Sequence, residues 1–336
     1  MFSSLPKLVD KNFVLGFLLP VLLAAFAALL LLHESAPSRV LYKALADKAD
    51  FSAALALIAV AVWTVSVFLM LCNHTFYQCL EGYVGPFAVE RWRKKLEDEF
   101  VTQRNQLDTD YAAITAPNST VSDAMRRDYF LRFRSLAERF PHEPHLVLPT
   151  RFGNIIRAFE TYPLQVYGID SIPAWIRMAA VIPKEFAALI DDSRAEVNFF
   201  VNTVVLATLL ALVGLGLFVW DGVSALTWAG TNWDYLLFAI AAFGVAGVAY
   251  HLAVDRAAAW GTFVKAAFDL YLPALAKQLG YKLPDTKDER EKFWDAVNSM
   301  LLYLQPLDPQ KWTVAEPAKA AKGGGGEDKE GDDDKD

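Results

Sequence analysis

Three arginines in one aromatic-rich stretch have the side chains best suited to binding a ligand. Arg151, Arg157 and Arg177 lie within residues 149–177. A planar guanidinium matches the oxygens of a phosphate, so these residues predict a site for an anionic lipid headgroup or a nucleotide phosphate. The competing interpretation is an internal network of ion pairs, which the i,i+3 spacing of Arg157 and Glu160 favours.

The part of the chain that contains this stretch is not basic overall. Residues 73–198 hold 12 Arg and 3 Lys against 17 Asp and Glu. A phosphate or lipid site there would therefore be a local pocket. The whole chain has a formal net charge of −7, which argues against nucleic acid as a partner because nucleic-acid binding depends on a basic surface.

His251 and Asp255 form a second pair with a chemistry of its own. They are four residues apart at the end of an apolar run. This spacing suits a proton-sensitive switch pair, because histidine changes its charge near neutral pH. An ordinary interfacial hydrogen bond is the simpler interpretation of the same spacing.

Metal and catalytic chemistry find little support. Cys72, His74 and Cys79 fall close together, but three ligands on a single helix cannot close the tetrahedron that zinc requires. The sequence contains no phosphate-binding loop, nucleophile elbow, zinc-protease helix or dinucleotide fingerprint. We therefore predict no catalytic residue, no metal and no cofactor.

The arginine-rich stretch also carries a likeness to other proteins. From Thr150 to Pro163 it has the pattern T-R-x-G-N-x-x-R-A-x-E-x-Y-P. This pattern resembles a segment of uncharacterised bacterial membrane proteins with four spans in a two-plus-two arrangement. The likeness covers about residues 149–202. It implies a bacterial cytoplasmic (inner) membrane protein and brings no named activity.

Four long runs lack any Asp, Glu, Lys or Arg: residues 13–32, 51–72, 199–220 and 235–254. At ~1.5 Å per residue each run crosses a hydrocarbon layer ~30 Å thick. A soluble helix would show a polar stripe, whereas these runs are apolar on all sides. We therefore predict an all-α polytopic membrane protein. The first run also fits a signal peptide, but its length and the lack of a cleavage site favour a retained anchor.

Small residues and one proline within these runs bear on how the helices pack. Pro20 is expected to kink the first span, because it removes a backbone hydrogen bond. The glycines that allow close approach to another span or another copy of the chain are Gly214, Gly216, Gly244 and Gly247. No span carries a charge at mid-depth, which argues against an ion-coupled transporter.

The distribution of Lys and Arg predicts the orientation in the membrane. The side that holds both termini and the long insert has seven basic residues near the spans: Lys7, Lys11, Arg91, Lys184, Arg194, Arg256 and Lys265. The opposite side has three, Arg39, Lys43 and Lys48. Both termini are therefore predicted to be cytoplasmic.

The charge-free runs divide the chain into six parts. We expect a cytoplasmic N-terminus (1–12), a first transmembrane hairpin (13–72), a cytoplasmic helical insert (73–198), a second hairpin (199–254), cytoplasmic C-terminal helices (255–312) and a disordered acidic tail (313–336). Between Pro183 and Trp220 only glycines near the far end interrupt the helical pattern. One continuous helix is therefore expected to join the insert to the third span.

Three functions compete on this basis. The first is a non-enzymatic, homo-oligomeric membrane protein whose cytoplasmic domain is coupled to the spans, in a channel-like or membrane-effector role. The second is a scaffold that recruits a soluble protein through the aromatic C-terminal helix and the acidic tail. The third, and weakest, is a membrane enzyme that acts on a lipid or a nucleotide.

Overall fold

A computed structural model describes residues 10–31, 51–117, 120–224, 232–308, 310–312 and 314. Within these residues the chain is helical and has no strand, apart from one isolated bridge between Tyr281 and Val314. The all-α prediction is confirmed for this part of the chain. The two short loops between paired spans and most of the acidic tail lie outside the described residues.

Four helical segments are long and apolar enough to cross a membrane, as the sequence predicts. The first comprises α1 (Lys11–Phe13), the π-helical turn η2 (Val14–Leu18) and α2 (Leu19–Leu31). The others are α4 (Phe51–Glu81), α9 (Lys184–Ser224) and α10 (Asp234–Gln278). Large apolar side chains on them are exposed, such as Leu57 at 69% and Leu71 at 73%. Such surfaces require lipid or another apolar partner.

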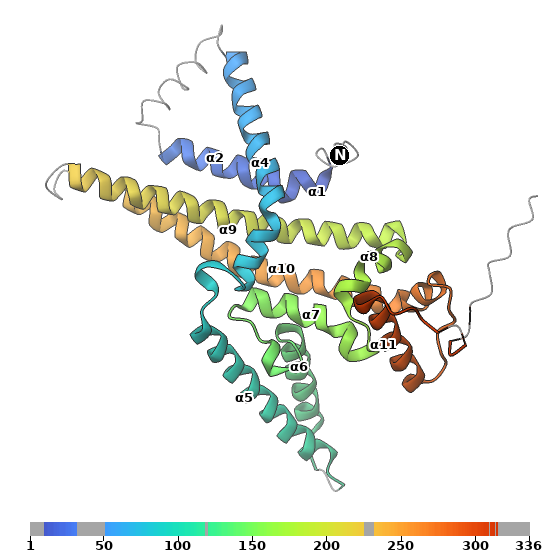
Figure 1. The fold of residues 1–336 in the computed structure, drawn as a ribbon. Coiled ribbons are helices and arrows are strands. Elements are labelled where there is room, and N and C mark those ends of the chain that lie inside the picture. Colours follow the sequence, from blue (N-terminus) through green and yellow to red (C-terminus); the bar gives the residue numbers. More distant parts are fainter. Residues whose placement is uncertain are drawn as a thin grey trace, which may run out of the picture.

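The helices α9 and α10 lie side by side as a long antiparallel pair (Figure 1). Alanines on α10 are buried along this contact at spacings of three or four residues: Ala239, Ala242, Ala246, Ala249, Ala253 and Ala257. Gly214 lies at the same contact, since an added Cβ would be 3.2 Å from the Tyr235 carbonyl oxygen. Small side chains therefore set the close approach of the two helices.

The first pair of candidate spans is arranged differently. The helix α4 crosses α2 and α9 steeply instead of running alongside them (Figure 1). The contact is apolar, with Val62 and Leu69 of α4 in one cluster with Phe13, Phe17 and Val21. How these helices sit in a bilayer, including the two-plus-two arrangement, stays a prediction.

Pro20 has a specific structural consequence. It has no N–H, so the Gly16 carbonyl oxygen lacks its regular donor one turn later. The buried side chain of Asn202 on α9 donates to this oxygen through Nδ2 at 2.8 Å. The π-helical turn Val14–Leu18 ends two residues before the proline, which places the irregularity of the helix there. The first span is thus joined to the third by a hydrogen bond that proline makes available.

Replacing Asn202 by leucine is expected to reduce the free energy of unfolding by about 1–3 kcal/mol, because a buried carbonyl is left without a donor. The double variant P20A/N202L should regain part of this loss, since alanine returns a backbone N–H to Gly16. Thr203→Val is the matched control, because in the described part of the chain the Thr203 hydroxyl bonds only within its own helix, to Phe199 O at 2.7 Å. Detergent-denaturation midpoints that are equal for N202L and T203V would contradict the assignment.

Capping side chains lie at the start of four helices outside the candidate spans. Ser122, Thr150, Asp170 and Thr286 each accept a hydrogen bond from a backbone N–H in the first turn. The helices outside the candidate spans are α5 (Glu90–Thr115), α6 (Asp123–Arg139), α7 (Arg151–Tyr167), α8 (Ser171–Val181) and α11 (Lys287–Tyr303), with 3-10 turns η3 (Gly85–Phe87) and η4 (Pro144–Leu146).

Two prolines lie inside helices instead of ending them. The helix α7 continues through Pro163 to Tyr167 and ends at Gly168, which has a positive φ of 79°. The hydroxyls of Tyr162 and Tyr167 both donate to Asp269 on α10, at 2.9 and 2.8 Å. These tertiary bonds hold the turn that contains Pro163.

The second proline is Pro273. The helix α10 continues past it to Gln278. Leu272, Leu275 and Ala276 on either side are buried in the main core. Burial of apolar side chains thus outweighs the local cost of proline.

The main core lies where α7, α8 and α11 pack around the charged ends of α9 and α10 (Figure 1). Its largest fully buried side chains include Phe152, Phe268, Phe293 and Trp294. The helices α5 and α6 project from α7 as a separate hairpin (Figure 1), with a small core of their own around Phe100 and Leu136. The helices α9 and α10 therefore belong both to the second pair of candidate spans and to the main core of the helical domain.

Candidate functional site

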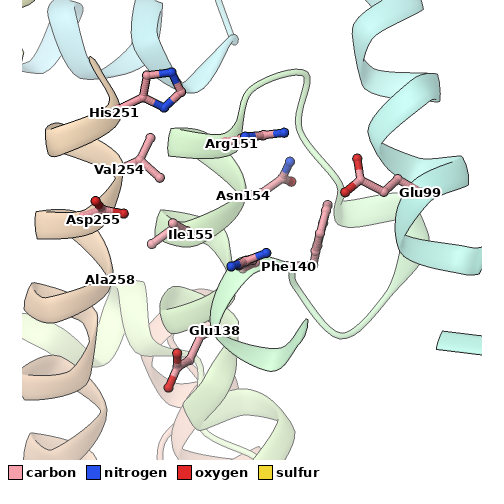
Figure 2. A pocket seen from close by; sticks show the side chains of 11 residues that line it. Glu99, Glu138, Phe140, Arg151, Asn154, Ile155, His251, Val254, Asp255 and Ala258 are labelled. Atoms are coloured by element: carbon pink, nitrogen blue, oxygen red, sulfur yellow. The ribbon is translucent and has the colours of Figure 1, made fainter. Parts of the chain in front are cut away.

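A polar cavity of about 380 Å³ lies where α5, α6, α7 and α10 meet. Figure 2 shows His251 and Asp255 one turn apart on α10, Glu99 of α5 on the opposite side, and Arg151 of α7 between them. Residues from two separate sequence predictions thus meet in one place. The remaining lining residues are Glu138, Arg139, Phe140, Asn154, Ile155, Val254 and Ala258.

The start of α7 is held rigidly beside this cavity. Thr150 caps the helix by accepting from Gly153 N at 2.9 Å. Asn154, only 1% exposed, accepts from Leu148 N at 2.7 Å and donates to Leu148 O at 2.8 Å. A satisfied buried amide fixes the backbone around it. The Cα of Arg151 therefore has a defined position at the cavity.

The cavity contains charges of both signs that do not neutralise one another directly. Among the described residues, the guanidinium groups of Arg139 and Arg151 form no hydrogen bond or ion pair. Glu138 pairs with Arg134 outside the lining, at 2.8 Å. Glu99 and Asp255 form no ion pair within the described part of the chain. Within the described residues, the lining thus offers two cations without an ion pair, Arg139 and Arg151, and the carboxylates of Asp255 and Glu99, of which Glu99 accepts a hydrogen bond from Gln103 Nε2 at 3.2 Å.

His251 and Asp255 do not form the predicted switch pair in this structure. No hydrogen bond or ion pair joins them within the described residues, and both side chains are exposed. Water can solvate each group separately, so their i,i+4 spacing does not force a contact. They share the cavity instead.

The other two predicted arginines lie elsewhere. Arg157 forms the predicted pair with Glu160 at 3.5 Å and is hydrogen-bonded to the Tyr83 hydroxyl. Burial raises the pKa of Glu160, and the positive charge of Arg157 opposes this shift. Because Arg157 is paired with Glu160, its surroundings agree with an internal ion pair rather than with a phosphate site. The exposed Arg177 donates to Pro173 O of its own helix at 2.9 Å. The three arginines therefore do not form a single site.

A second, mostly apolar cavity of about 650 Å³ lies beside the first. The two cavities share Glu99, Arg151 and His251. The apolar cavity extends to Val204 and Thr208 of α9 and to Phe243 and Gly247 of α10, all within the charge-free runs. The apolar cavity therefore extends from the polar cavity to the charge-free parts of α9 and α10.

The predicted packing glycines differ in their surroundings. Nothing lies within 4 Å of a Cβ added at Gly216, Gly244 or Gly247, so these three contact no other span among the described residues. Gly247 lines the apolar cavity instead. Its missing side chain keeps that cavity open.

Sequence reasoning missed Glu99, Arg139 and Asn154 as members of the site. Glu99 and Arg139 are two of many charges on exposed helix faces, and nothing local distinguishes them. Asn154 offered a better signal, because it lies next to the apolar residues Ile155 and Ile156 of α7, and an amide needs hydrogen-bond partners when it is buried.

These features define the class of protein: within the described residues, an all-α chain with four helices long and apolar enough to span a membrane, and a charged cavity where one of them, α10, meets α5, α6 and α7. Comparison with protein-family models, curated proteins and solved structures finds no match. The resemblance of residues 149–202 to bacterial four-span proteins therefore stays a prediction.

Proposed function

We propose that this chain is a non-enzymatic integral protein of a bacterial cytoplasmic membrane, with both termini in the cytoplasm. Its helical domain is coupled to the spans, and it acts as a homo-oligomer in a channel-like or membrane-effector role. The observation that carries the proposal is the continuity of α9 and α10. They have 41 and 45 residues, or roughly 60–70 Å each, about twice what a bilayer core needs.

Coupling follows from where the two halves of these helices pack. One half of each is charge-free, and the other half contributes buried side chains, such as Ile190 and Phe268, to the core that also contains residues of α7, α8 and α11. Both Val197 and Ala253 are fully buried near the point where the halves join. A displacement of the domain is therefore transmitted along unbroken helices rather than absorbed by a loop.

An apolar groove on α9 supports the oligomer. It is lined by Leu212, Leu215, Gly216, Val219, Trp220 and Val223. Trp220 is 74% exposed, and Gly216 faces open space. A glycine-floored groove lets a helix of a second copy approach closely in a bilayer.

Gly216→Leu tests this interface without disturbing the protomer, because an added side chain meets nothing there. We expect oligomers of the unaltered protein in mass photometry of lipid nanodiscs, and conductance in planar bilayers. The variant should shift the protein toward monomers. Ala241→Leu, at another exposed position, is the control. Only monomers and no conductance for the unaltered protein would overturn the proposal.

The alternative function, a scaffold for a soluble protein, was based on the aromatic C-terminal helix and the acidic tail, and the first of these is not available as a surface. The aromatic face of α11, offered by the sequence as a surface for a soluble partner, is buried: Phe293 is 0% and Trp294 1% exposed. Most of the acidic tail lies outside the described residues. A soluble partner would therefore have to bind the tail or the charged outer face of α11.

A further inference from the structure

The two adjoining cavities together have the shape and polarity of a single amphiphile. One is charged and the other is mostly apolar, and Arg151, His251 and Glu99 lie at their boundary. Their volumes, about 380 and 650 Å³, are both within the range of ~300–1,000 Å³ typical of ligand pockets. A soluble metabolite would use only the charged part.

The charges indicate which headgroup fits. The cavities also contain the cations Arg139 and Lys95 and the carboxylate of Glu138, which pairs with Arg134. A purely anionic group at Arg151 would face the carboxylates of Glu99 and Asp255 as well. A zwitterion satisfies both signs, with its phosphate at the boundary, next to the apolar chains, and its cation farther along the charged cavity. The ammonium of a primary amine has three N–H donors for these carboxylates, whereas a quaternary amine has none.

We propose that the paired cavities bind one membrane phospholipid with a phosphoethanolamine headgroup. An acyl chain occupies the apolar cavity along Val204, Phe243 and Gly247, the phosphate accepts from the Arg151 guanidinium, and the ammonium donates to Asp255 and Glu99. The inference rests on the proposed placement in a bilayer, but it requires neither an oligomer nor a pore.

Each part of the ligand has its own variant. Arg151→Gln removes the phosphate partner, Asp255→Asn removes an ammonium partner, and Gly247→Leu fills the apolar cavity. Two matched controls come from outside the cavities. Arg177→Gln alters an arginine that, among the described residues, bonds only to its own helix. Gly244→Leu adds a side chain in open space one turn from Gly247.

The experiment is native mass spectrometry of the delipidated full-length protein with phosphatidylethanolamine, phosphatidylcholine or phosphatidylglycerol of identical acyl chains. We expect one tightly retained phosphatidylethanolamine per protomer. Arg151→Gln should weaken retention about tenfold or more, as loss of a charge-assisted hydrogen bond does. Gly247→Leu should weaken all three lipids, and Asp255→Asn should remove the preference for the primary amine. The controls should bind as the unaltered protein does.

Three results would overturn the inference. One is equal loss in Arg151→Gln and Arg177→Gln, and another is tighter retention of phosphatidylglycerol than of phosphatidylethanolamine. The third is equal binding of soluble phosphoethanolamine, which would assign the site to a water-soluble ligand. Because lipid is counted per protomer, these outcomes are distinguishable from a protein that proves monomeric or non-conducting.

Discussion

Replacing Trp294 by alanine is expected to reduce the free energy of unfolding by about 3–5 kcal/mol, the cost of deleting a large buried aromatic side chain. Trp294 is 1% exposed and packs beside Phe293, with ring centroids 4.9 Å apart. Its loss leaves a cavity under α11 in the main core. Membrane insertion should be unchanged, since the charge-free runs do not depend on α11.

Denaturation midpoints of the purified protein in one detergent measure this effect. Tyr303→Ala, on the same helix but 70% exposed, is the control and should change the free energy of unfolding by about 0.5 kcal/mol or less. The outcome also separates two functions. A Trp294→Ala variant of unaltered stability that lost a soluble partner would favour the scaffold interpretation over the coupled membrane protein.

Alanine at Gly153 is expected to destabilise the protein by about 3 kcal/mol, near the upper end for overpacking. Gly153 lies in the first turn of α7, directly against the end of α4. An added Cβ would collide with the Glu81 carbonyl oxygen and lie 2.9 Å from Glu81 Cα. These are backbone atoms and cannot turn away as a side chain can. The helix α7 must therefore shift, and Arg151 shifts with it.

Gly244→Ala provides the control for this variant. It also adds one methyl group to a helix, but in open space. Alanine is favoured over glycine in a helix, so this variant should be neutral or slightly stabilised. Identical denaturation midpoints for G153A and G244A would show that α4 and α7 are not in the close contact described here. Reduced phosphatidylethanolamine retention in G153A alone would connect this contact to the lipid site.

Helix starts were predictable because capping is a local interaction. Thr150 and Thr286 each bond a backbone N–H three residues away, and such a pattern is visible in a short window of sequence. Helix ends at proline were not predictable in the same way. Pro163 continues its helix because of bonds to Asp269, more than 100 residues along the chain.

That Arg151 and Arg157 lie apart could be predicted in part from helix geometry. Six residues on a helix rotate a side chain by about 240° relative to the first, so Arg151 and Arg157 could not share a face of α7. What could not be calculated was which face would meet α10. Arg151, Glu99 and Asp255 line one cavity only because α7 docks on α10 and the α5–α6 hairpin docks on α7.

The sequence by itself determined the four helices that are long and apolar enough to span a membrane. Long charge-free runs and local caps act within one helix and need no distant partner. The tertiary structure alone decided what the small and polar residues in those helices do. Gly214 packs, Gly247 lines a cavity, and Asn202 donates to Gly16. These roles depend on the distances between residues far apart in the chain, which are set by how whole helices pack rather than by any local pattern.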